Sequence, residues 1–528
     1  MCTCAYPQTK EHPPKDHPRD GEIPDADTRA WWHTTEALSN DGMEGRDTGS
    51  AAYQRAAEYV SRRFQQAGLK PAGENGTWFQ TVPIHEIDVL PEGTSFVVTR
   101  ASNETLPLRF LEEITVAPTA VPDGVEGALV FRGYCGRNDV GPDVAGKFVL
   151  CFGTQRQGLP GGAERASSVR AAGAAGIINI DDPYFSIEPP RWPFAYARTV
   201  TLKQAGDAQR GQADGGKVFL SMRLSAAAFA ALLKGTGQDS AEVLRAGGAK
   251  EPLKGFEIPA KLAVKVNTRE KEISSPNVIA VLPGSDPKLK DEYVVVAAHL
   301  DGYGYGMPVN GDALYNGALD DAAYVALLVQ LALNMNPAIH PASHTAIQLP
   351  APKRSILFCA FTGEEKGLLG SNWFVAHPTI PLSQIAADIN LDQLRPLFPL
   401  TILTTLAIDE TTLGATAKEV GVKMGIELRP DREPERALLR RADQFPFLRA
   451  GVPAISFVFG FDPGTDAERK YREWYQVRYH RPQDDLTQPM DFAAAAKFNL
   501  FFYRLVGAVG DAPERPSFLP GSQFKQGK

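Results

Sequence analysis

The sequence predicts an α/β fold with a doubly wound, mostly parallel central sheet flanked by helices and interrupted by an inserted β-rich unit. From residue 277 onward, apolar strand-like runs alternate with helical segments, as expected of a sheet buried on both faces. Residues 111–262 instead contain short β-like runs and many glycines. The length of 528 residues exceeds what one ordinary core accommodates, which also indicates more than one domain.

The chain begins with a segment that has little to bury. Residues 1–28 are rich in proline and charge, so we expect a disordered or loosely docked tail, with order beginning near Trp31. The following stretch AAYQRAAEYVSRRFQQAGLK places Ala56, Val60 and Phe64 four residues apart, with charged residues between them, and Gly68 lies near its end. This spacing predicts an amphipathic helix with a glycine stop.

The middle and the end of the chain differ in their patterns of apolar residues and glycines. The runs GALVFRG, VAGKFVLCF and AAGAAGIINI predict a compact β-rich unit with one Ala/Gly helix over residues 111–262. We expect residues 29–110 and 263–528 to form one discontinuous domain around it, with NVIAVLP, EYVVVAAHLD, SILFCAF, IAADINLD, LTILTTL and AISFVFG as strands. His340 and His344 fall in a Pro-containing connection and are expected in a solvated loop.

Charge and composition narrow the partners. The 55 Lys+Arg and 62 Asp+Glu give a net charge of -7 without long single-sign blocks, which argues against a nucleic-acid binder. No run approaches the about 18 consecutive apolar residues of a membrane span, so we expect peptides or small molecules as partners. The cysteines show no metal-binding CxxC spacing; Cys135 and Cys151 could pair, and Cys359 is expected to behave as a small buried hydrophobe.

Acidic and histidine side chains follow the predicted strands. Taken singly, each has an ordinary explanation, as a core histidine, a helix N-cap or a turn former. Together they place mixed His and carboxylate groups at one edge of one sheet, where such sheets bind ligands, and this mixture is what zinc prefers. The residues are His299 and Asp301, Asp320 and Asp321, Glu364 and Glu365, Asp392, and Tyr479 and His480.

The order of these motifs resembles that of the co-catalytic di-zinc exopeptidase family, which includes aminopeptidase Y, bacterial secreted aminopeptidases and glutamate carboxypeptidase. The motifs are HxD, GAxDD, GEExGLLGS, NLD and YHxPxDD; each alone is weak, but the combination is specific. MEGRDTGS and RADQFPFLRAGVPAISF are similar to segments flanking that family's core, and GKFVLCFG followed by RAAGAAGIINIDD resembles its inserted protease-associated domain. The resemblance runs from about Trp31 to about Gly510 and implies a fold of the zinc-exopeptidase type.

The resemblance also implies two zinc ions per chain and a ligand for each position. His299 and Asp392 would bind one zinc, Glu365 and His480 the other, and Asp320 would bridge them. In the family the peptide bond after the bridging aspartate is cis without proline.

Three further residues receive roles from the same resemblance. Glu364 would be the general base, Tyr479 would hydrogen-bond the developing oxyanion, and Asp301 would hold the ring of His299. Adjacent residues of a strand point to opposite faces, so both glutamates can reach one site only from a turn beyond the strand. Gly363 and Gly367 make such a turn feasible.

The sequence departs from the family pattern at two places. Ala322, Ala323 and Tyr324 replace a small-Ser-Gly run, so Tyr324 either narrows the site or packs under it. Gln444 follows Asp443 where the family has histidine. Both departures concern substrate preference more than metal binding.

The expected activity is that of a zinc-dependent aminopeptidase acting on peptides. A carboxypeptidase would use the same metals and base but clamp a carboxylate with Arg or Lys, for which Arg395, Arg440 and Arg441 are candidates. A non-catalytic receptor-like protein would keep the fold without the activity, and a glutaminyl cyclase would change the reaction, but the cyclases lack the insertion. Family resemblance favours an extracellular or periplasmic location, although the first residues lack a signal-peptide core.

Overall fold

The computed structural model describes residues 17–203, 218–336, 349–392 and 394–525. The chain divides into two compact units. The first, here called the discontinuous unit, comprises Met1–Pro83, Ser274–Tyr305 and Asn310–Lys528. The second, the inserted unit, comprises Ile84–Ile273 and Gly306–Val309.

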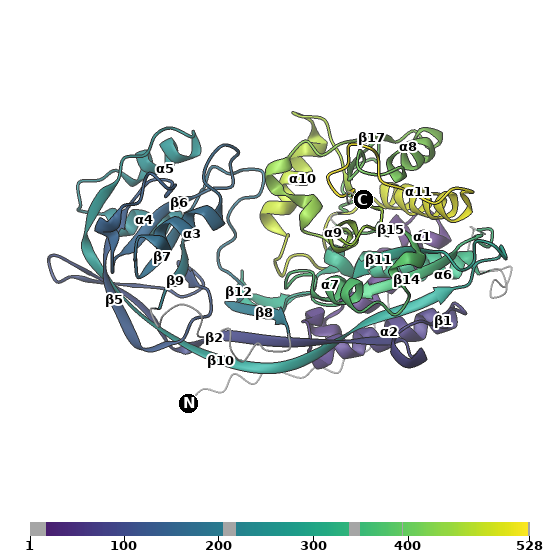
Figure 1. Ribbon diagram of the computed structural model, residues 1–528, viewed down its shortest axis with the longest axis horizontal. Helices are drawn as coiled ribbons and strands as arrows, with labels where there is room; N and C mark the ends of the chain where they lie inside the picture. The colour runs from purple at the N-terminus through teal and green to yellow at the C-terminus, as the bar shows by residue number, and fades with distance from the viewer. Residues whose placement is uncertain (1–16, 204–217, 337–348, 393, 526–528) are drawn as a thin grey trace. The chain divides into compact units, whose positions relative to one another are not determined.

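A mostly parallel sheet forms the centre of the discontinuous unit (Figure 1). Its strand order is β17-β16-β18-β15-β11-β14-β10. Neighbours from β18 to β14 are parallel, whereas β16 and β10 run antiparallel to the strands beside them, β18 and β14. The strands are β10 (Phe256–Leu282), β11 (Tyr293–His299), β14 (Ser355–Phe361), β15 (Ile385–Asn390), β16 (Ile402–Leu406), β17 (Glu427–Arg429) and β18 (Ala454–Phe459).

Helices cover both faces of this sheet, as the alternation of buried residues along β11 shows. Val294 and Val296 belong to one hydrophobic core, which residues of α1, α2, α6, α10 and α11 complete. Val295 belongs to a second core, with Phe374 of α7 and Phe447 of α9. The predicted doubly wound α/β fold is confirmed. The helices are α1 (Ala26–Ser39), α2 (Ala51–Gln66), α6 (Ala323–Met335), α7 (Leu369–Ala376), α9 (Gln444–Arg449), α10 (Asp466–Val477) and α11 (Phe492–Asp511).

Among the residues that the structure describes, two helical segments are long and apolar enough to cross a membrane, Ala318–Met335 and Phe492–Asp511. Within the structure, 94% and 61% of their residues are buried. Burial inside the protein explains their apolar composition, because core helices of globular proteins are apolar on most sides.

Helix α2 forms as its sequence predicts. The side chain of Ser50 caps it by accepting a hydrogen bond from the Tyr53 amide, which satisfies one of the unpaired N–H groups at the helix start. Ala56, Val60 and Phe64 are completely buried, and Gly68 leaves the helix at a φ of 73°.

The start of the chain is more ordered than its composition predicts. Residues 17–28 contain a short 3-10 helix and the first turn of α1, where Asp25 accepts a hydrogen bond from the Thr28 amide. Ile23 and Asp27 are 5% and 1% exposed. The expectation of a loose tail is therefore wrong for residues 17–28, whereas residues 1–16, like His340 and His344, lie outside the described residues.

Asp27 makes the stability of the discontinuous unit depend on pH. Its buried carboxylate accepts hydrogen bonds from Gln330, Asn334 and Tyr503, yet burial raises its pKa above the ordinary value. The folded protein therefore binds a proton more readily than the unfolded chain. The free energy of unfolding should fall as pH rises from the unfolded pKa of about 3.9 through the raised folded pKa.

An Asp27→Asn variant tests this effect. The difference in unfolding free energy, wild type minus variant, should decrease as pH rises from about 4 through the raised folded pKa, because the variant lacks the titrating group. Chemical denaturation at several pH values measures this difference. A difference that grows with pH would contradict the assignment.

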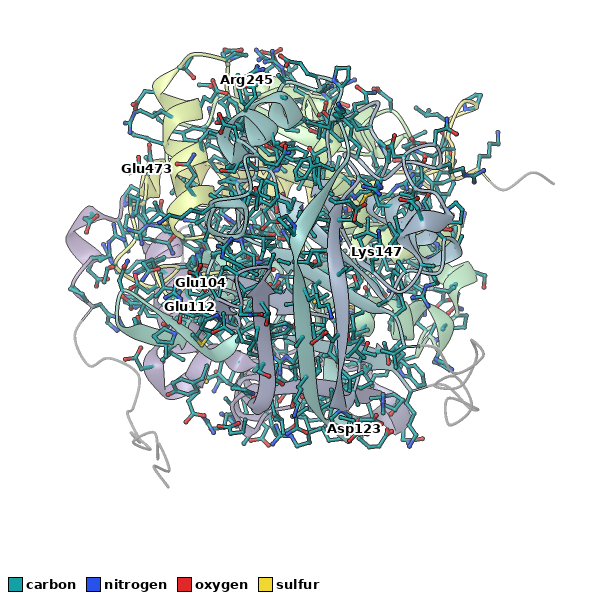
Figure 2. The ribbon with its side chains drawn as sticks, turned by 90° about the vertical axis from the view of Figure 1, so that its left-hand side faces the viewer. Glu104, Glu112, Asp123, Lys147, Arg245 and Glu473 are labelled. Atoms are coloured by element: carbon teal, nitrogen blue, oxygen red, sulfur yellow. A yellow bond between two sulfur atoms is a disulfide. The ribbon has the colours of Figure 1, made fainter. Side chains whose placement is uncertain are left out.

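The inserted unit is rich in β-strands, as expected, but its described residues contain more α-helix than the single Ala/Gly helix that the sequence predicts. Strands β5, β6, β7 and β9 are parallel neighbours, and β4 closes the edge antiparallel to β9. Three α-helices lie in the described residues of this unit, and its exposed charged side chains include Asp123 and Arg245 (Figure 2). The elements are β4 (Ile114–Val116), β5 (Val121–Phe131), β6 (Phe148–Gly153), β7 (Gly176–Asp181), β9 (Leu220–Leu224), α3 (Gly162–Ala171), α4 (Ala226–Leu233) and α5 (Ser240–Gly248).

The inserted unit is also longer than the predicted 111–262. It begins at Ile84 because β2 (Phe79–Arg100) pairs there with β3 (Thr105–Leu108) and β8 (Arg198–Leu202). It extends to Ile273 because much of β10 pairs with β5. The composition of residues 84–110 does not reveal which strands they pair with, so the predicted boundary is wrong.

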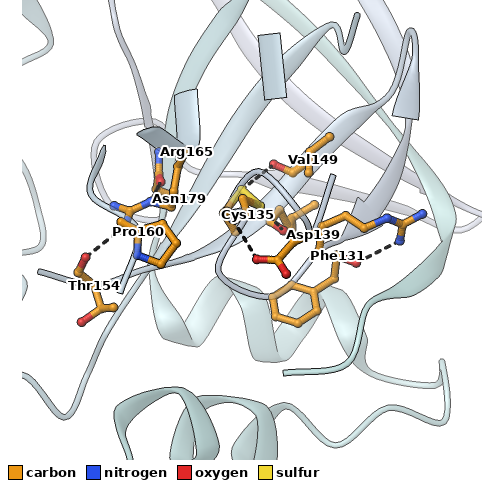
Figure 3. Close-up of a disulfide and its surroundings, with 12 residues drawn as sticks. Phe131, Cys135, Asp139, Val149, Thr154, Pro160, Arg165 and Asn179 are labelled. Atoms are coloured by element: carbon orange, nitrogen blue, oxygen red, sulfur yellow. Dashed lines mark hydrogen bonds between the residues drawn. A yellow bond between two sulfur atoms is a disulfide. The ribbon is translucent and has the colours of Figure 1, made fainter. Parts of the chain in front are cut away.

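The inserted unit contains a disulfide between Cys135 and Cys151, which confirms the pairing considered from the sequence (Figure 3). Cys151 lies in β6, and both residues are completely buried. Cys359, in β14 of the discontinuous unit, is a buried free thiol whose pKa is raised well above its ordinary value by burial. It behaves as the small hydrophobe that the sequence predicts.

Candidate metal centre

The candidate ligands lie where adjacent strands of the discontinuous unit end. His299 is the last residue of β11, Glu364 and Glu365 follow β14, and Asp392 follows β15. Strands β14, β11 and β15 are parallel neighbours, so their carboxyl ends meet at one edge of the sheet. Asp320 comes from the irregular turn before α6 and His480 from the segment after α10.

The two adjacent glutamates lie in a turn beyond β14, as expected. Gly363 and Gly367 have φ values of 67° and 108°, a region that only glycine enters without strain. The amide of Gly367 donates to the Glu364 carbonyl, which closes the turn. Both glutamate side chains can therefore approach the same site.

Five side chains form two overlapping clusters. In each cluster the potential ligand atoms lie within 4.8 Å of one another. The Oδ1 atom of Asp320 is 3.4 Å from His299 Nε2, and its Oδ2 atom is 3.4 Å from His480 Nε2. Asp320 thus faces both histidines, one with each oxygen. The clusters are His299, Asp320 and Asp392, and Asp320, Glu365 and His480.

The histidine ring nitrogens are oriented for ligation. The Nδ1–H group of His299 donates to the backbone carbonyl of Asp301 at 3.1 Å. This leaves the lone pair of the neutral imidazole on Nε2, which faces Asp320. In His480, Nδ1 lies 2.8 Å from the Tyr303 hydroxyl, while Nε2 lies 3.1 Å from Glu365 Oε2.

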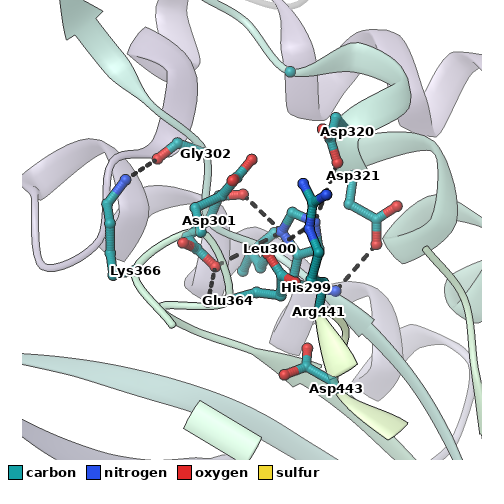
Figure 4. A network of polar contacts seen from close by, with 12 residues as sticks. His299, Leu300, Asp301, Gly302, Asp320, Asp321, Glu364, Lys366, Arg441 and Asp443 are labelled. Atoms are coloured by element: carbon teal, nitrogen blue, oxygen red, sulfur yellow. Dashed lines mark hydrogen bonds and ion pairs between the residues drawn. The ribbon is translucent and has the colours of Figure 1, made fainter. Parts of the chain in front are cut away.

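The site has an excess of buried negative charge (Figure 4). Burial lowers the pKa of His299, but the carboxylates of Asp321 and Glu364 outweigh it and raise that pKa well above its ordinary value. For the Glu364 carboxyl, burial has the opposite effect and raises the pKa well above its ordinary value. A divalent cation would compensate these charges, since metal binding replaces protons on such ligands.

Two buried atoms further support the fit to zinc. Among the described residues, neither His299 Nε2 nor Asp320 Oδ2 makes a hydrogen bond. Buried polar atoms are rarely left without a partner, so each such atom requires an explanation. Imidazole and carboxylate donors that converge in this way suit a zinc ion.

Arg395 lies beside the shared aspartate and does not line an open pocket. Its Nη2 atom is 3.3 Å from Asp320 Oδ1, and its guanidinium lies 4.4 Å from the ring centroid of Trp474. The side chain is completely buried. Although burial alone raises the pKa of Asp320, Arg395 and the two histidines hold it well below its ordinary value.

The turn that carries Asp320 is held from two directions. The Asp320–Asp321 peptide is cis, as the family resemblance implied. Asp484 accepts hydrogen bonds from the amides of Leu319 and Asp320, both at 3.0 Å. Asp484 belongs to the YHxPxDD motif, but the sequence alone indicated no role for it.

Arg46 supports the same region from the MEGRDTGS segment. It is completely buried, and its guanidinium donates to backbone carbonyls that flank two ligand-bearing loops. This role was also missed, because a sequence shows that the arginine is present but not which carbonyls it reaches. The acceptors include Leu300, Asn316 and Gly317, at 2.8–2.9 Å.

Asp301 acts differently from its expected role. It was expected to hold His299 through its carboxylate, but the backbone carbonyl is the hydrogen-bond acceptor, and Asp301 Oδ1 lies 3.7 Å from His299 Nδ1. The carboxylate instead accepts from the Glu364 amide at 3.0 Å and from the Thr48 hydroxyl at 2.9 Å. Asp301 therefore positions both His299 and the glutamate turn.

Tyr303 is a further residue that the sequence did not single out. Its hydroxyl contacts His480 Nδ1 at 2.8 Å, and the Lys366 ammonium lies 4.6 Å from its ring centroid. Partners of this kind fix the orientation of a ligand histidine and increase metal affinity. The tyrosine stands within HLDGYGYG, close to a candidate ligand, which is the one signal the sequence offered.

We predict that Tyr303→Phe weakens zinc binding by about 10–100-fold, because His480 loses its orienting partner. Competition with a chromogenic chelator measures the affinity. Tyr305→Phe is the matched control, since Tyr305 is two residues away and 40% exposed. Equal affinities in wild type and Tyr303→Phe would contradict the role.

The remaining predicted residues lie close to the centre. Tyr479 is nearly buried, its ring lies 3.7 Å from that of His480, and its hydroxyl accepts from Arg441 at 3.2 Å. Tyr324 is buried and donates to the Leu394 carbonyl at 2.7 Å. Of the two readings of Tyr324, packing under the site is the one the structure shows.

The other departure from the family pattern is also a packing contact. Gln444 is completely buried, accepts a hydrogen bond from Asn390 at 3.0 Å and donates to the Leu439 carbonyl. Asn390 ends β15, just before Asp392. Gln444 therefore supports the strand end that carries a candidate ligand.

Comparison with known proteins places this geometry in a family context. Residues 277–505 match the model of peptidase family M28, a region that contains all five candidate ligands. Among curated proteins, a probable zinc metalloprotease of Pyrenophora tritici-repentis is 27% identical over 46% of this chain and 58% of its own length. A glutamate carboxypeptidase 2 homolog of Caenorhabditis elegans is 25% identical over 43% of this chain and 29% of its length. The matches thus span less than two thirds of these relatives.

Solved structures share the fold over nearly the whole chain. An aminopeptidase from Aneurinibacillus sp. strain AM-1 superimposes with a TM-score of 0.61 at 18% identity, covering 93% of this chain and 95% of its own. A zinc aminopeptidase from Bacillus subtilis gives a TM-score of 0.55 at 18% identity, covering 93% and 96%. The chain has the fold of these aminopeptidases. The resemblance drawn from the sequence motifs is confirmed by the match of residues 277–505 to peptidase family M28.

Proposed function

We propose that this protein is a zinc-dependent exopeptidase, and specifically an aminopeptidase that removes N-terminal residues from peptides. The observation that carries the proposal is the pair of clusters that share Asp320. His299 and Asp392 would hold one zinc, Glu365 and His480 the other, with Asp320 between them. When bound, two such ions supply an activated water and polarise the scissile carbonyl.

The residues around the ligands would perform the remaining chemistry. Glu364 takes a proton from the attacking water and delivers it to the leaving amine. Asp301 holds this base in place through the Glu364 amide. Tyr479 donates toward the developing oxyanion, and the hydrogen bond that its oxygen accepts from Arg441 makes the hydroxyl a stronger donor.

Carboxypeptidase action is the closest alternative, because it would need the same ligands and base. It also requires a cation to clamp the substrate carboxylate. Of the three arginines considered for this purpose, Arg395 is buried against Asp320, Arg441 donates to Tyr479, and Arg440 is exposed. Because Arg395 and Arg441 are engaged by other protein groups, we favour the aminopeptidase.

We also propose that the inserted unit is a protease-associated domain and that the protein works outside the cytoplasm. The first proposal rests on the sequence resemblance of GKFVLCFG and RAAGAAGIINIDD. The second is supported by the disulfide between Cys135 and Cys151, since such bonds persist mainly in oxidising compartments.

A panel of aminoacyl nitroanilides and N-blocked dipeptides tests the activity, each assayed with chelator and after zinc is restored. The proposal predicts chelator-sensitive cleavage of the free-amine substrates alone. Cleavage of blocked dipeptides alone would indicate a carboxypeptidase. Failure to cleave either, with zinc bound, would indicate a receptor-like protein.

A further inference from the structure

A second group of histidine and carboxylate side chains lies at the start of the discontinuous unit, separate from the centre described above. His17, His33 and Glu36 place potential ligand atoms within 4.8 Å of one another. His33 and Glu36 are one turn apart on α1, so they share a face of the helix, and His17 comes from the segment before it. We propose that these three residues bind an additional zinc-type divalent cation.

The charges of the cluster favour a cation. The two imidazole rings stack with centroids 3.5 Å apart and planes 17° apart, so two protonated rings would repel each other. Glu36, whose side chain is 3% exposed, contacts His17 Nδ1. A cation held by neutral imidazole nitrogens and this carboxylate would satisfy all three groups at once.

Asp20 completes the arrangement from outside the three ligands. Its Oδ1 atom lies 2.7 Å from His33 Nε2, the position from which a carboxylate orients a metal-binding imidazole. Its Oδ2 atom is 3.8 Å from Arg29, so Asp20 has a positively charged partner of its own. The Arg29 charge therefore pairs with Asp20 rather than with the Glu36 carboxylate.

The proposed cation would act on structure rather than on substrate. It would join the segment before α1 to the helix itself, and this segment is the part of the chain that composition predicts to be loose. The site shares no residue with the candidate catalytic centre, so the proposal of an additional cation can be tested independently of the proposed peptidase activity.

Zinc content tests the site in the full-length protein. Wild type, His33→Gln and Glu36→Gln are saturated with zinc chloride, dialysed, and analysed by inductively coupled plasma mass spectrometry. Each variant should retain one zinc fewer per chain than wild type, whatever the catalytic centre holds. Equal zinc content in wild type and both variants would overturn the proposal.

Two further variants guard against effects of misfolding. His85→Gln is the matched control, because His85 also contacts a glutamate, Glu272 at 2.9 Å, but belongs to none of the ligand clusters among the described residues; its zinc content should equal that of wild type. Asp20→Asn should keep the full content at saturation while the affinity of one site weakens by about 10–100-fold. An unchanged affinity in Asp20→Asn, or an equal loss of zinc in His85→Gln, would contradict the assignment.

Discussion

Glu364→Gln is expected to reduce peptide hydrolysis by about 10²–10⁴-fold, the usual contribution of a general base, while zinc content stays at the wild-type level. Glutamine has nearly the shape of glutamate but cannot accept the proton of the attacking water. The Glu364 amide would still donate to Asp301, so the turn should keep its conformation. Turnover numbers and zinc analysis on the same preparation measure both quantities.

The adjacent residue provides the comparison for this prediction. Glu365 lies 3.1 Å from His480 Nε2 and belongs to a candidate ligand cluster, so Glu365→Gln should lower zinc affinity as well as activity. Glu419→Gln, at an exposed position, should change neither quantity. Full turnover in Glu364→Gln, or loss of zinc from it, would refute the division of roles between the two glutamates.

Asp320→Asn should affect both metal positions at once, because Asp320 faces both histidines. We expect the zinc content of the centre to fall at both positions and hydrolysis to be lost. The substitution also leaves Arg395 buried without its carboxylate partner, which typically costs about 3–5 kcal/mol of stability. Zinc analysis and chemical denaturation measure the two effects separately.

A double variant separates metal binding from charge pairing. Replacing both residues, Asp320→Asn with Arg395→Met, removes the unpaired buried charge and should recover much of the lost stability. It should not recover zinc binding. Wild-type zinc content in Asp320→Asn would contradict the bridging role, and failure of the double variant to regain stability would show that Arg395 has another function.

The central sheet was predictable because its strands are continuous apolar runs. Along β11 both faces are buried in helical layers, so the strand reads as a continuous apolar run, which a parallel sheet requires. The candidate ligands were found for the same reason, since His299 ends such a run, and Asp392 and the two glutamates come a few residues after one. The order of the five motifs along the chain then indicated the family.

Other features depend on contacts between distant segments and could not be read from the sequence. Arg46 looks like a surface arginine, yet it is buried against backbone carbonyls about 250–270 residues away. Asp301 orients His299 through its backbone carbonyl rather than through its carboxylate. The order of residues 17–28 was missed because Asp27, charged and near the chain start, is held by partners on α6 and α11.

Anomalous diffraction at the zinc edge, from crystals of the zinc-loaded protein, tests the central claim most directly. The account predicts two zinc peaks about 3.5–4 Å apart, the usual separation in two-metal sites. One should lie between His299 and Asp392 and the other between Glu365 and His480, with Asp320 contacting both. A single peak, or zinc bound without Asp320, would contradict the proposed di-zinc centre.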